Sequence, residues 1–333
     1  MRPLAVSLGC PAGIGPEVAV AAAAEVAWPL MLVGDPAVVR RAAGTVGVDP
    51  ARLFLCEDAS QAIPEGRIGV FAGSHRLGAL PPPGKPGRDA GAAQLAWIDQ
   101  ALTLVREGRA SALVTGPVSK DVIAGSGAPG AEGFAGHTEY LRDRLGADEV
   151  VMAFVGGPLR LSLVTTHLPL REVADAVTPE GVARASYWLA RLLVDLGEAE
   201  PQIVVAALNP HAGEGGRLGD EEIRVIAPGM ALARARLAAA GVAASLVGPM
   251  GAETAMRRAA AGELSGVVAM YHDQGTIPLK LLGFGEAVNV SLGLPIVRTS
   301  VDHGTGYDRA GLGTASPAGM REALALAARL SKA

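Results

Sequence analysis

The chain has 333 residues, of which 50% are hydrophobic, and carries a formal net charge of -4. This length allows two domains with real cores, and the slight acidity argues against a nucleic-acid surface or a basic membrane patch. The two cysteines, Cys10 and Cys56, provide no disulfide framework. The N-terminus lacks a cleavable signal pattern, and the alanine-rich stretch 18–26 is too short to span a bilayer. The sequence therefore predicts a soluble cytoplasmic protein without nucleic-acid or membrane partners.

Apolar runs and helical periodicity alternate from the N-terminus, and glycine and proline punctuate them. The predicted strands of the first third lie at 4–8, 30–33, 67–72 and 112–114, and the predicted helices at 16–27, 36–47 and 90–109. The glycine-rich loop at 9–15 is either a cradle for substrate or phosphate or a plain strand-to-helix turn, and the sequence leaves both open. Lys120, just past a strand end, is a candidate anion ligand, although most lysines are solvated.

The middle of the chain changes this alternation. Residues 125–130 (GSGAPG) match a dinucleotide-binding fingerprint by letter, but no strand precedes them and Pro129 falls where the helix should begin, which excludes that reading. A helix is predicted at 139–145, with His137 and Thr138 near its N-terminus, a favourable place for an anion. Strands at 150–155 and 159–164 joined by Gly156-Gly157-Pro158 predict an antiparallel hairpin. Further helices are predicted at 178–196, about 219–241 and about 317–330. The whole chain thus predicts an α/β fold with a mixed sheet, two domains and a cleft between them.

Three of the six histidines share one context, in which a buried-looking strand runs into a short polar loop. They are His167 in Thr165–Pro169, His211 in Asn209–Gly213, and His272 in Tyr271–Asp273. Ligands of open α/β sheets bind outside the carboxyl ends of the strands, where three imidazoles would form a divalent-metal site. A capped structural histidine is the ordinary alternative at each position, and the spacing alone leaves both readings open.

Seven separate strings, in order along the chain, resemble the 4-hydroxythreonine-4-phosphate dehydrogenase family of pyridoxal phosphate biosynthesis. They are PAGIGPE at 11–17, TGPVSK at 115–120, GHTE at 136–139, TTHLPL at 165–170, NPHAGEGG at 209–216, MYHDQG at 270–275 and LGLPIVRTSVDHGT at 292–305. The resemblance implies an isocitrate/isopropylmalate dehydrogenase-like fold of two α/β/α domains. It predicts one domain of residues 1–130 plus 305–333, and a metal, substrate and dimerisation domain of residues 131–304.

The resemblance also assigns residues to the site. It implies His167, His211 and His272 as metal ligands, with His272 serving the neighbouring subunit of a homodimer whose active site is shared. It implies His137, Thr138, Lys280, Asn289 and Arg298 as substrate ligands, and Lys280 is also a candidate catalytic base. The expected metal is zinc, with magnesium or cobalt as alternatives, and the expected cofactor is NAD or NADP, for which no binding residues are identified.

The implied reaction oxidises 4-phosphooxy-L-threonine to 2-amino-3-oxo-4-phosphooxybutanoate, which decarboxylates to 3-amino-2-oxopropyl phosphate. Two positions depart from the family pattern, Glu253 in place of the usual aspartate and Gly306 in place of the usual alanine. A dehydrogenase of threonate or erythronate 4-phosphate is one alternative. A metal-dependent hydrolase or a phosphoryl or acyl transferase is the alternative from another class.

Overall fold

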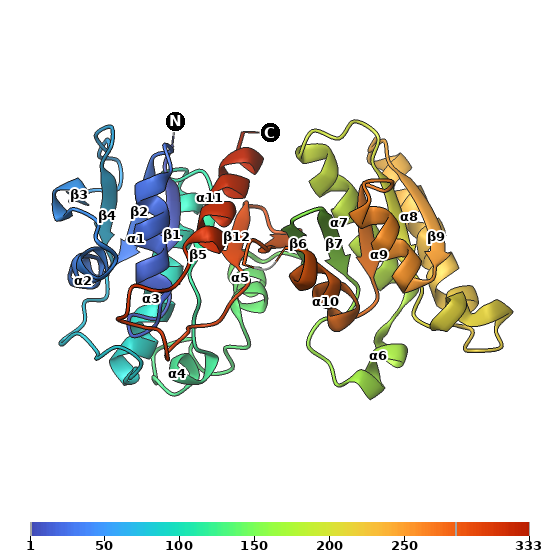
Figure 1. Ribbon diagram of the computed structural model, residues 1–333, viewed down its shortest axis with the longest axis horizontal. Helices are drawn as coiled ribbons and strands as arrows, with labels where there is room; N and C mark the ends of the chain where they lie inside the picture. The colour runs from blue at the N-terminus through green and yellow to red at the C-terminus, as the bar shows by residue number, and fades with distance from the viewer. Residues whose placement is uncertain (1, 284, 333) are drawn as a thin grey trace. The chain divides into compact units, whose positions relative to one another are not determined.

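The computed structural model describes residues 2–283 and 285–332, which form two compact units (Figure 1). Unit 1 comprises the chain up to Leu145 together with Pro295–Lys332, and unit 2 comprises Gly146–Leu294. The boundaries differ from the expected 130/131 and 304/305 because two elements belong to unit 1. Helix α5 (His137–Leu145) is tied to α3 (Arg88–Arg106) by a 2.7 Å hydrogen bond from Tyr140 to Asp99, and β12 (Arg298–Val301) pairs with β5 (Leu113–Thr115).

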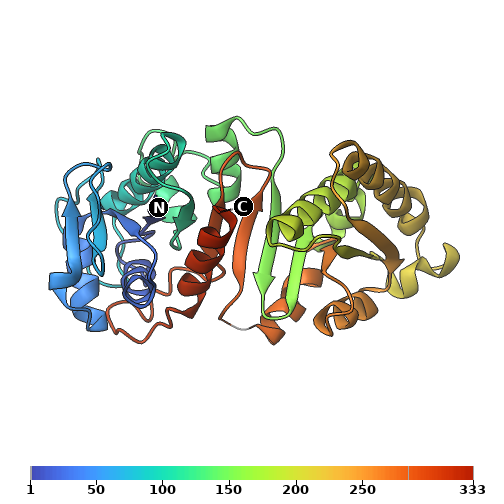
Figure 2. The ribbon, with the colours of Figure 1, turned by 90° about the horizontal axis from the view of Figure 1, so that it is seen from above.

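The sheet of unit 1 is parallel throughout, in the order β3-β4-β2-β1-β5-β12. Its other strands are β1 (Leu4–Ser7), β2 (Leu30–Gly34), β3 (Leu53–Cys56) and β4 (Ile68–Ala72). Helices α1 (Gly15–Glu25), α2 (Pro36–Val46) and α11 (Ala318–Leu330) cover one face, while α3 with the short α4 (Lys120–Ala124) covers the other (Figure 2). Burial on both faces explains why β1 and β2 are almost continuously apolar in sequence, whereas the edge strand β3 is partly exposed.

The sheet of unit 2 is mixed, as predicted, in the order β11-β6-β7-β10-β8-β9. Its strands are β6 (Val151–Gly156), β7 (Leu159–Leu163), β8 (Gln202–Ala206), β9 (Ser245–Met250), β10 (Gly266–Ala269) and β11 (Val288–Leu292). Strand β6 runs antiparallel to both β11 and β7, which confirms the predicted hairpin, and the remaining pairs are parallel. Helices α7 (Pro179–Asp195) and α8 (Ala227–Ala239) cover one face, and α9 (Ala252–Ala260) and α10 (His272–Leu282) cover the other (Figure 2).

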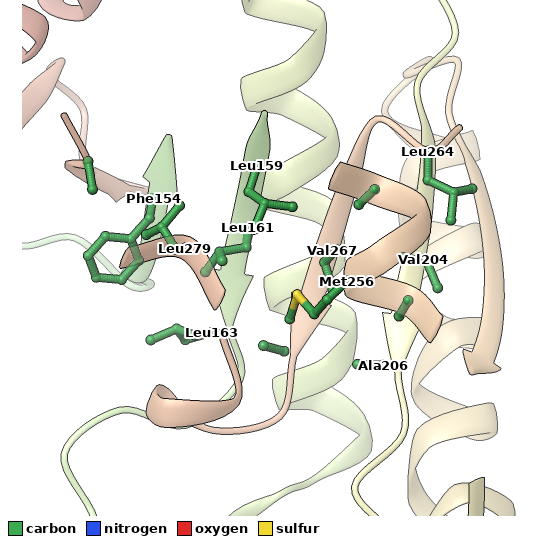
Figure 3. Packing of buried hydrophobic residues seen from close by; sticks show 14 of the residues in the cluster. Phe154, Leu159, Leu161, Leu163, Val204, Ala206, Met256, Leu264, Val267 and Leu279 are labelled. Atoms are coloured by element: carbon green, nitrogen blue, oxygen red, sulfur yellow. The ribbon is translucent and has the colours of Figure 1, made fainter. Parts of the chain in front are cut away.

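A buried apolar cluster fixes the strands of unit 2 beneath α9 and α10 (Figure 3). Phe154 of β6, Leu161 of β7 and Val267 of β10 are almost fully buried in it, and Met256 and Leu279 pack onto them from the two helices. A register slip of one residue would turn these side chains to the opposite face. The cluster therefore determines which residues emerge at the ends of β7, β8 and β10.

The structure corrects two sequence-based expectations about elements in unit 2. His272 does not begin a loop but is the first residue of α10, with Tyr271 as its N-cap. The helix predicted from about 219 to 241 begins instead as a π-helical turn, Glu222–Ile226, before α8. No helix within residues 2–283 and 285–332 combines the length and hydropathy that a bilayer span requires.

Candidate functional site

Three neighbouring parallel strands of unit 2, β7, β10 and β8, end at the same edge of the sheet. Their ends are tied by side chains. The Thr165 hydroxyl donates to the Met270 carbonyl at 2.7 Å, and the Gln274 amide donates to the Ala207 carbonyl at 2.8 Å. The segments that follow these strands carry His167, His272 and His211, respectively. Two side-chain hydrogen bonds therefore connect the strand ends from which the three histidine-bearing segments emerge.

His167 and His272 lie side by side at this edge, with ring centroids 5.6 Å apart and an angle of 41° between the ring planes. The His272 ring is held from behind, because its Nδ1 lies 2.7 Å from a carboxylate oxygen of Asp273 and 3.3 Å from the Thr276 hydroxyl. Carboxylate contacts of this kind orient metal-binding imidazoles and leave the other ring nitrogen, here Nε2, for the ligand. Asp273 and Thr276 were not predicted as site residues, although their i+1 and i+4 spacing from His272 is the relevant signal once α10 is known.

His211 is placed differently, on an exposed turn between β8 and α8. His211, Ala212, Gly213 and Glu214 all have positive φ, at 54°, 53°, 75° and 46°. Left-handed backbone costs roughly 1–2 kcal/mol for each residue other than glycine, so this turn persists only because its surroundings impose it. Within the described residues, no three histidine, cysteine or acidic side chains are grouped closely enough to hold a metal ion. The structure thus brings His167 and His272 together and does not bring His211 to them.

The histidine pair fits part of a divalent-metal site. Two imidazoles on tied strand ends, one of them oriented by a carboxylate, are donors that suit zinc and cobalt. A site with an open position for substrate usually has three protein ligands, so one further donor is required. His211, on its exposed and strained turn, has the right chemistry for that donor.

A second group of polar side chains lies in unit 1, around the N-terminus of α5. Burial first, and then the charges of Arg298 and Lys120, holds the pKa of His137 well below its ordinary value of 6.5. The Nε2 atom of His137 is buried and has no hydrogen-bond partner within the described protein. Arg298, only 3% exposed, donates to the Thr115 hydroxyl at 2.7 Å, and burial lowers its pKa to about 10. The buried Arg298, the exposed Lys120 and the N-terminus of α5 together favour an anionic ligand.

The remaining predicted substrate residues are Thr138, Lys280 and Asn289. Thr138 is buried in the first turn of α5, beside His137. Lys280 is exposed on α10, and Asn289 is half-buried on β11, so both belong to unit 2. Their roles stay predictions.

The glycine-rich loop at 9–15 is packed too closely to be an open cradle. A Cβ on Gly9 would lie 2.3 Å from the Pro117 carbonyl oxygen, and one on Gly13 would lie 2.6 Å from that of Thr305. These glycines allow backbone segments to approach each other, which favours the structural reading of the loop. The rejected fingerprint at 125–130 indeed follows the helix α4 and not a strand.

Of the two positions that depart from the family pattern, only Gly306 has a clear structural reason. It has a φ of 53°, and a Cβ there would lie 2.8 Å from Ile14, so glycine suits this backbone. Glu253 is exposed in the first turn of α9, where it contacts Thr254 and Arg257.

Comparison with known proteins shows the family to which this chain belongs. The family described as "Pyridoxal phosphate biosynthetic protein PdxA" matches residues 25–327. The chain belongs to this family. It is 45% identical over 332 residues to a 4-hydroxythreonine-4-phosphate dehydrogenase of Aromatoleum aromaticum, covering 97% of this chain and 95% of the relative.

Solved structures agree with this membership in the PdxA family. The crystal structure of 4-hydroxythreonine-4-phosphate dehydrogenase from Klebsiella pneumoniae superposes with a TM-score of 0.85 at 35% identity, covering 99% of this chain and all of that one. A terephthalate 1,2-cis-dihydrodiol dehydrogenase from Burkholderia xenovorans superposes with a TM-score of 0.68 at 32% identity, covering 98% and 97%. The fold expected from the family resemblance is therefore confirmed.

Proposed function

We propose that this chain is a metal-dependent, nicotinamide-linked dehydrogenase of 4-phosphooxy-L-threonine that acts in pyridoxal phosphate biosynthesis. The observation that carries the proposal is the near-full-length identity of 39–45% to relatives that bear the name 4-hydroxythreonine-4-phosphate dehydrogenase. In this reaction the C3 carbon of the substrate gives up a hydride to the nicotinamide, and its hydroxyl gives up a proton. The product carries its carboxylate β to the new carbonyl, an arrangement that loses CO₂ readily.

Several residues are proposed to bind the phosphate-bearing substrate. Arg298, Lys120 and the N-terminus of α5 supply local positive charge, which suits a phosphate-bearing substrate on a protein whose net charge is -4. His137, Thr138, Lys280 and Asn289 complete the proposed set of substrate ligands. At neutral pH the lowered pKa leaves the His137 imidazole uncharged, so its buried Nε2 can accept or donate one hydrogen bond.

His167, His211 and His272 are the proposed ligands of a divalent cation, zinc in the first instance. A bound cation of this kind supplies Lewis-acid polarisation of a substrate oxygen. The 5.6 Å separation of the His167 and His272 rings favours these two as ligands from one chain. The exposed His211, rather than the His272 expected from the sequence, then comes from the partner subunit of a homodimer. Exposed Leu218 and Ile223 on the same segment give it an apolar surface for such a contact.

One assay tests this function. Purified protein is incubated with NAD or NADP and 4-phosphooxy-L-threonine, and the absorbance of reduced nicotinamide is followed. We expect reduction that stops when a chelator removes the metal and returns on addition of zinc. If neither this substrate nor threonate 4-phosphate led to reduced nicotinamide, the dehydrogenase assignment would be wrong. If turnover continued in the presence of the chelator, only the proposed role of the metal would be wrong.

The same assay separates the biosynthetic substrate from its rival. Threonate 4-phosphate differs from 4-phosphooxy-L-threonine only in a hydroxyl where the amine stands. We expect a higher kcat/KM for the amino substrate, and a preference for threonate 4-phosphate would reassign the chain to the sugar-acid phosphate dehydrogenases.

A further inference from the structure

The turn that carries His211 is built around a buried carboxylate. The turn belongs to the yellow segment that leads into α8 in Figure 1. Glu222, the first residue of the π-helical turn, is only 3% exposed although the segment around it is largely solvated. A buried carboxylate is costly unless it is fully hydrogen-bonded, so the partners of Glu222 show which groups it holds in place.

The hydrogen-bond partners of the Glu222 carboxylate lie at the start of this segment. One carboxylate oxygen accepts hydrogen bonds from the backbone N–H groups of Leu208, at 2.9 Å, and Asn209, at 2.8 Å. The other accepts from the Asn209 side-chain amide at 3.1 Å, and Glu221 accepts from the same amide at 2.6 Å. The carboxylate therefore fixes the two residues that enter the left-handed turn, in both backbone and side chain.

The rest of the segment closes over these groups. A Cβ on Gly213 would lie 2.6 Å from the Glu222 carboxylate, and a Cβ on Gly219 would lie 2.4 Å from the Asn209 amide. The Gly213 carbonyl accepts from the backbone N–H groups of Gly216 and Leu218 at 2.9 and 3.0 Å. The turn is thus wrapped around Glu222 and Asn209, which explains how His211, Ala212 and Glu214 are kept in a conformation that they would not adopt alone.

We infer that Glu222 is a positioning residue for His211. It touches neither substrate nor metal, and acts by imposing the left-handed turn that presents the imidazole. This inference rests on the proposed function, because it assumes that His211 is a metal ligand. The alternative is a purely structural role, in which Glu222 merely joins β8 to α8 and the presentation of His211 does not depend on it.

Metal binding distinguishes these two roles without any measurement of activity. Metal-free full-length protein is titrated with Co²⁺ alone, and the visible absorption band reports both affinity and coordination. Loss of a residue that orients a metal ligand typically weakens metal binding 10- to 100-fold. We expect Glu222→Gln to weaken Co²⁺ binding by about that factor and to shift the band towards that of His211→Ala.

Hydrogen exchange provides the structural readout of the same variant. In Glu222→Gln the amide hydrogens of Leu208 and Asn209 should exchange faster than in the wild type. Arg224→Ala is the matched control, because it removes an exposed ion pair with Asp220 from the same π-helical turn without touching the buried carboxylate. It should leave both the Co²⁺ titration and the exchange of these two amides unchanged.

Two results would overturn the inference, and they differ from each other. If Glu222→Gln bound Co²⁺ like the wild type while His211→Ala did not, Glu222 would be structural only and the proposed function would stand. If His211→Ala itself bound Co²⁺ like the wild type, the ligand set of the proposed function would fail, and the inference with it. Should Glu222→Gln not fold, Asn209→Ala, which removes the amide but keeps the carboxylate, applies the same test.

Discussion

At the scale of single residues, a histidine in the segment after a buried strand was the sequence pattern that singled out His167 and His272. The rings of these two histidines lie 5.6 Å apart. It did not reveal that His211 sits in a left-handed turn, because no sequence rule predicts positive φ for three residues other than glycine. That conformation depends on Glu222, eleven positions further along the chain, which only the folded structure brings into contact with the turn's first residues.

The pKa of His137 leads to a prediction at the same scale. Because the folded-state pKa is held below the ordinary value of 6.5, the unfolded chain takes up this proton first as the pH falls. Stability is therefore lost on acidification through 6.5, until the folded imidazole also titrates. Lowering the pH from about 7 to 5 should cost the wild type about 1–2 kcal/mol more in free energy of unfolding than it costs His137→Gln.

Urea unfolding of both proteins at the two pH values measures this difference. His303→Gln is the matched control for the substitution itself, since His303 lies on an exposed loop segment. Equal losses of stability in the wild type and His137→Gln would show that His137 is not held in its neutral form.

At the scale of elements, apolar periodicity predicted the long helices and most of the buried strands to within a few residues, because packing on both faces of each sheet requires it. It did not predict the sheet-edge strands β3 and β9 or helix α9. It also missed α10, in which Gly275 and Pro278 interrupt the helical pattern, and the π-helical turn before α8. In both places tertiary contacts override local preference. Thr276 of α10 contacts His272, and Gln274 of α10 bonds to the backbone at the ends of β8 and β10. The contacts that stabilise this helix are therefore made with the candidate site itself.

Glu149 offers a prediction about how elements of unit 2 are joined. Its carboxylate accepts two hydrogen bonds from Arg236 of α8, at 2.7 and 2.9 Å, and one from the Trp188 indole of α7 at 2.8 Å. The Arg236 guanidinium also lies 3.9 Å from the Tyr187 ring centroid. The bonds from Arg236 are the main cause that holds the pKa of Glu149 below its ordinary value of 4.5. We expect Glu149→Gln to lower the free energy of unfolding by about 1–2 kcal/mol at neutral pH.

The sign of the pH dependence follows from the lowered pKa. The contribution of Glu149 is complete above the pKa of the unfolded carboxyl and is lost as the pH falls through the folded value. The difference between wild type and Glu149→Gln should therefore shrink in acid, as measured by urea unfolding. Glu263→Gln breaks the exposed pair with Arg258 and should cost less than about 1 kcal/mol, so an equal cost of the two substitutions would contradict this account.

At the scale of the whole molecule, the sequence predicted two α/β units with boundaries at 130/131 and 304/305, whereas the compact units of the structure divide at 145/146 and 294/295. The segments 131–145 and 295–304 carry His137, Thr138 and Arg298, and strand pairing and helix contacts assign them to unit 1. The pairing of β12 with β5 and the hydrogen bond from Tyr140 to Asp99 each join residues far apart along the chain, so the sequence does not reveal them. Unit 1 thus carries the cationic group around α5, and unit 2 carries the three histidines.

We propose that each metal site of the dehydrogenase takes His167 and His272 from one chain and His211 from its partner subunit. Mixing inactive variants under conditions of subunit exchange, and following reduced nicotinamide, tests it. His167→Ala mixed with His211→Ala should regain roughly a quarter of wild-type activity, because half of the dimers are mixed and each of these has one intact site. His167→Ala mixed with His272→Ala should regain none. Recovery in the second mixture and not in the first would contradict this division of the ligands.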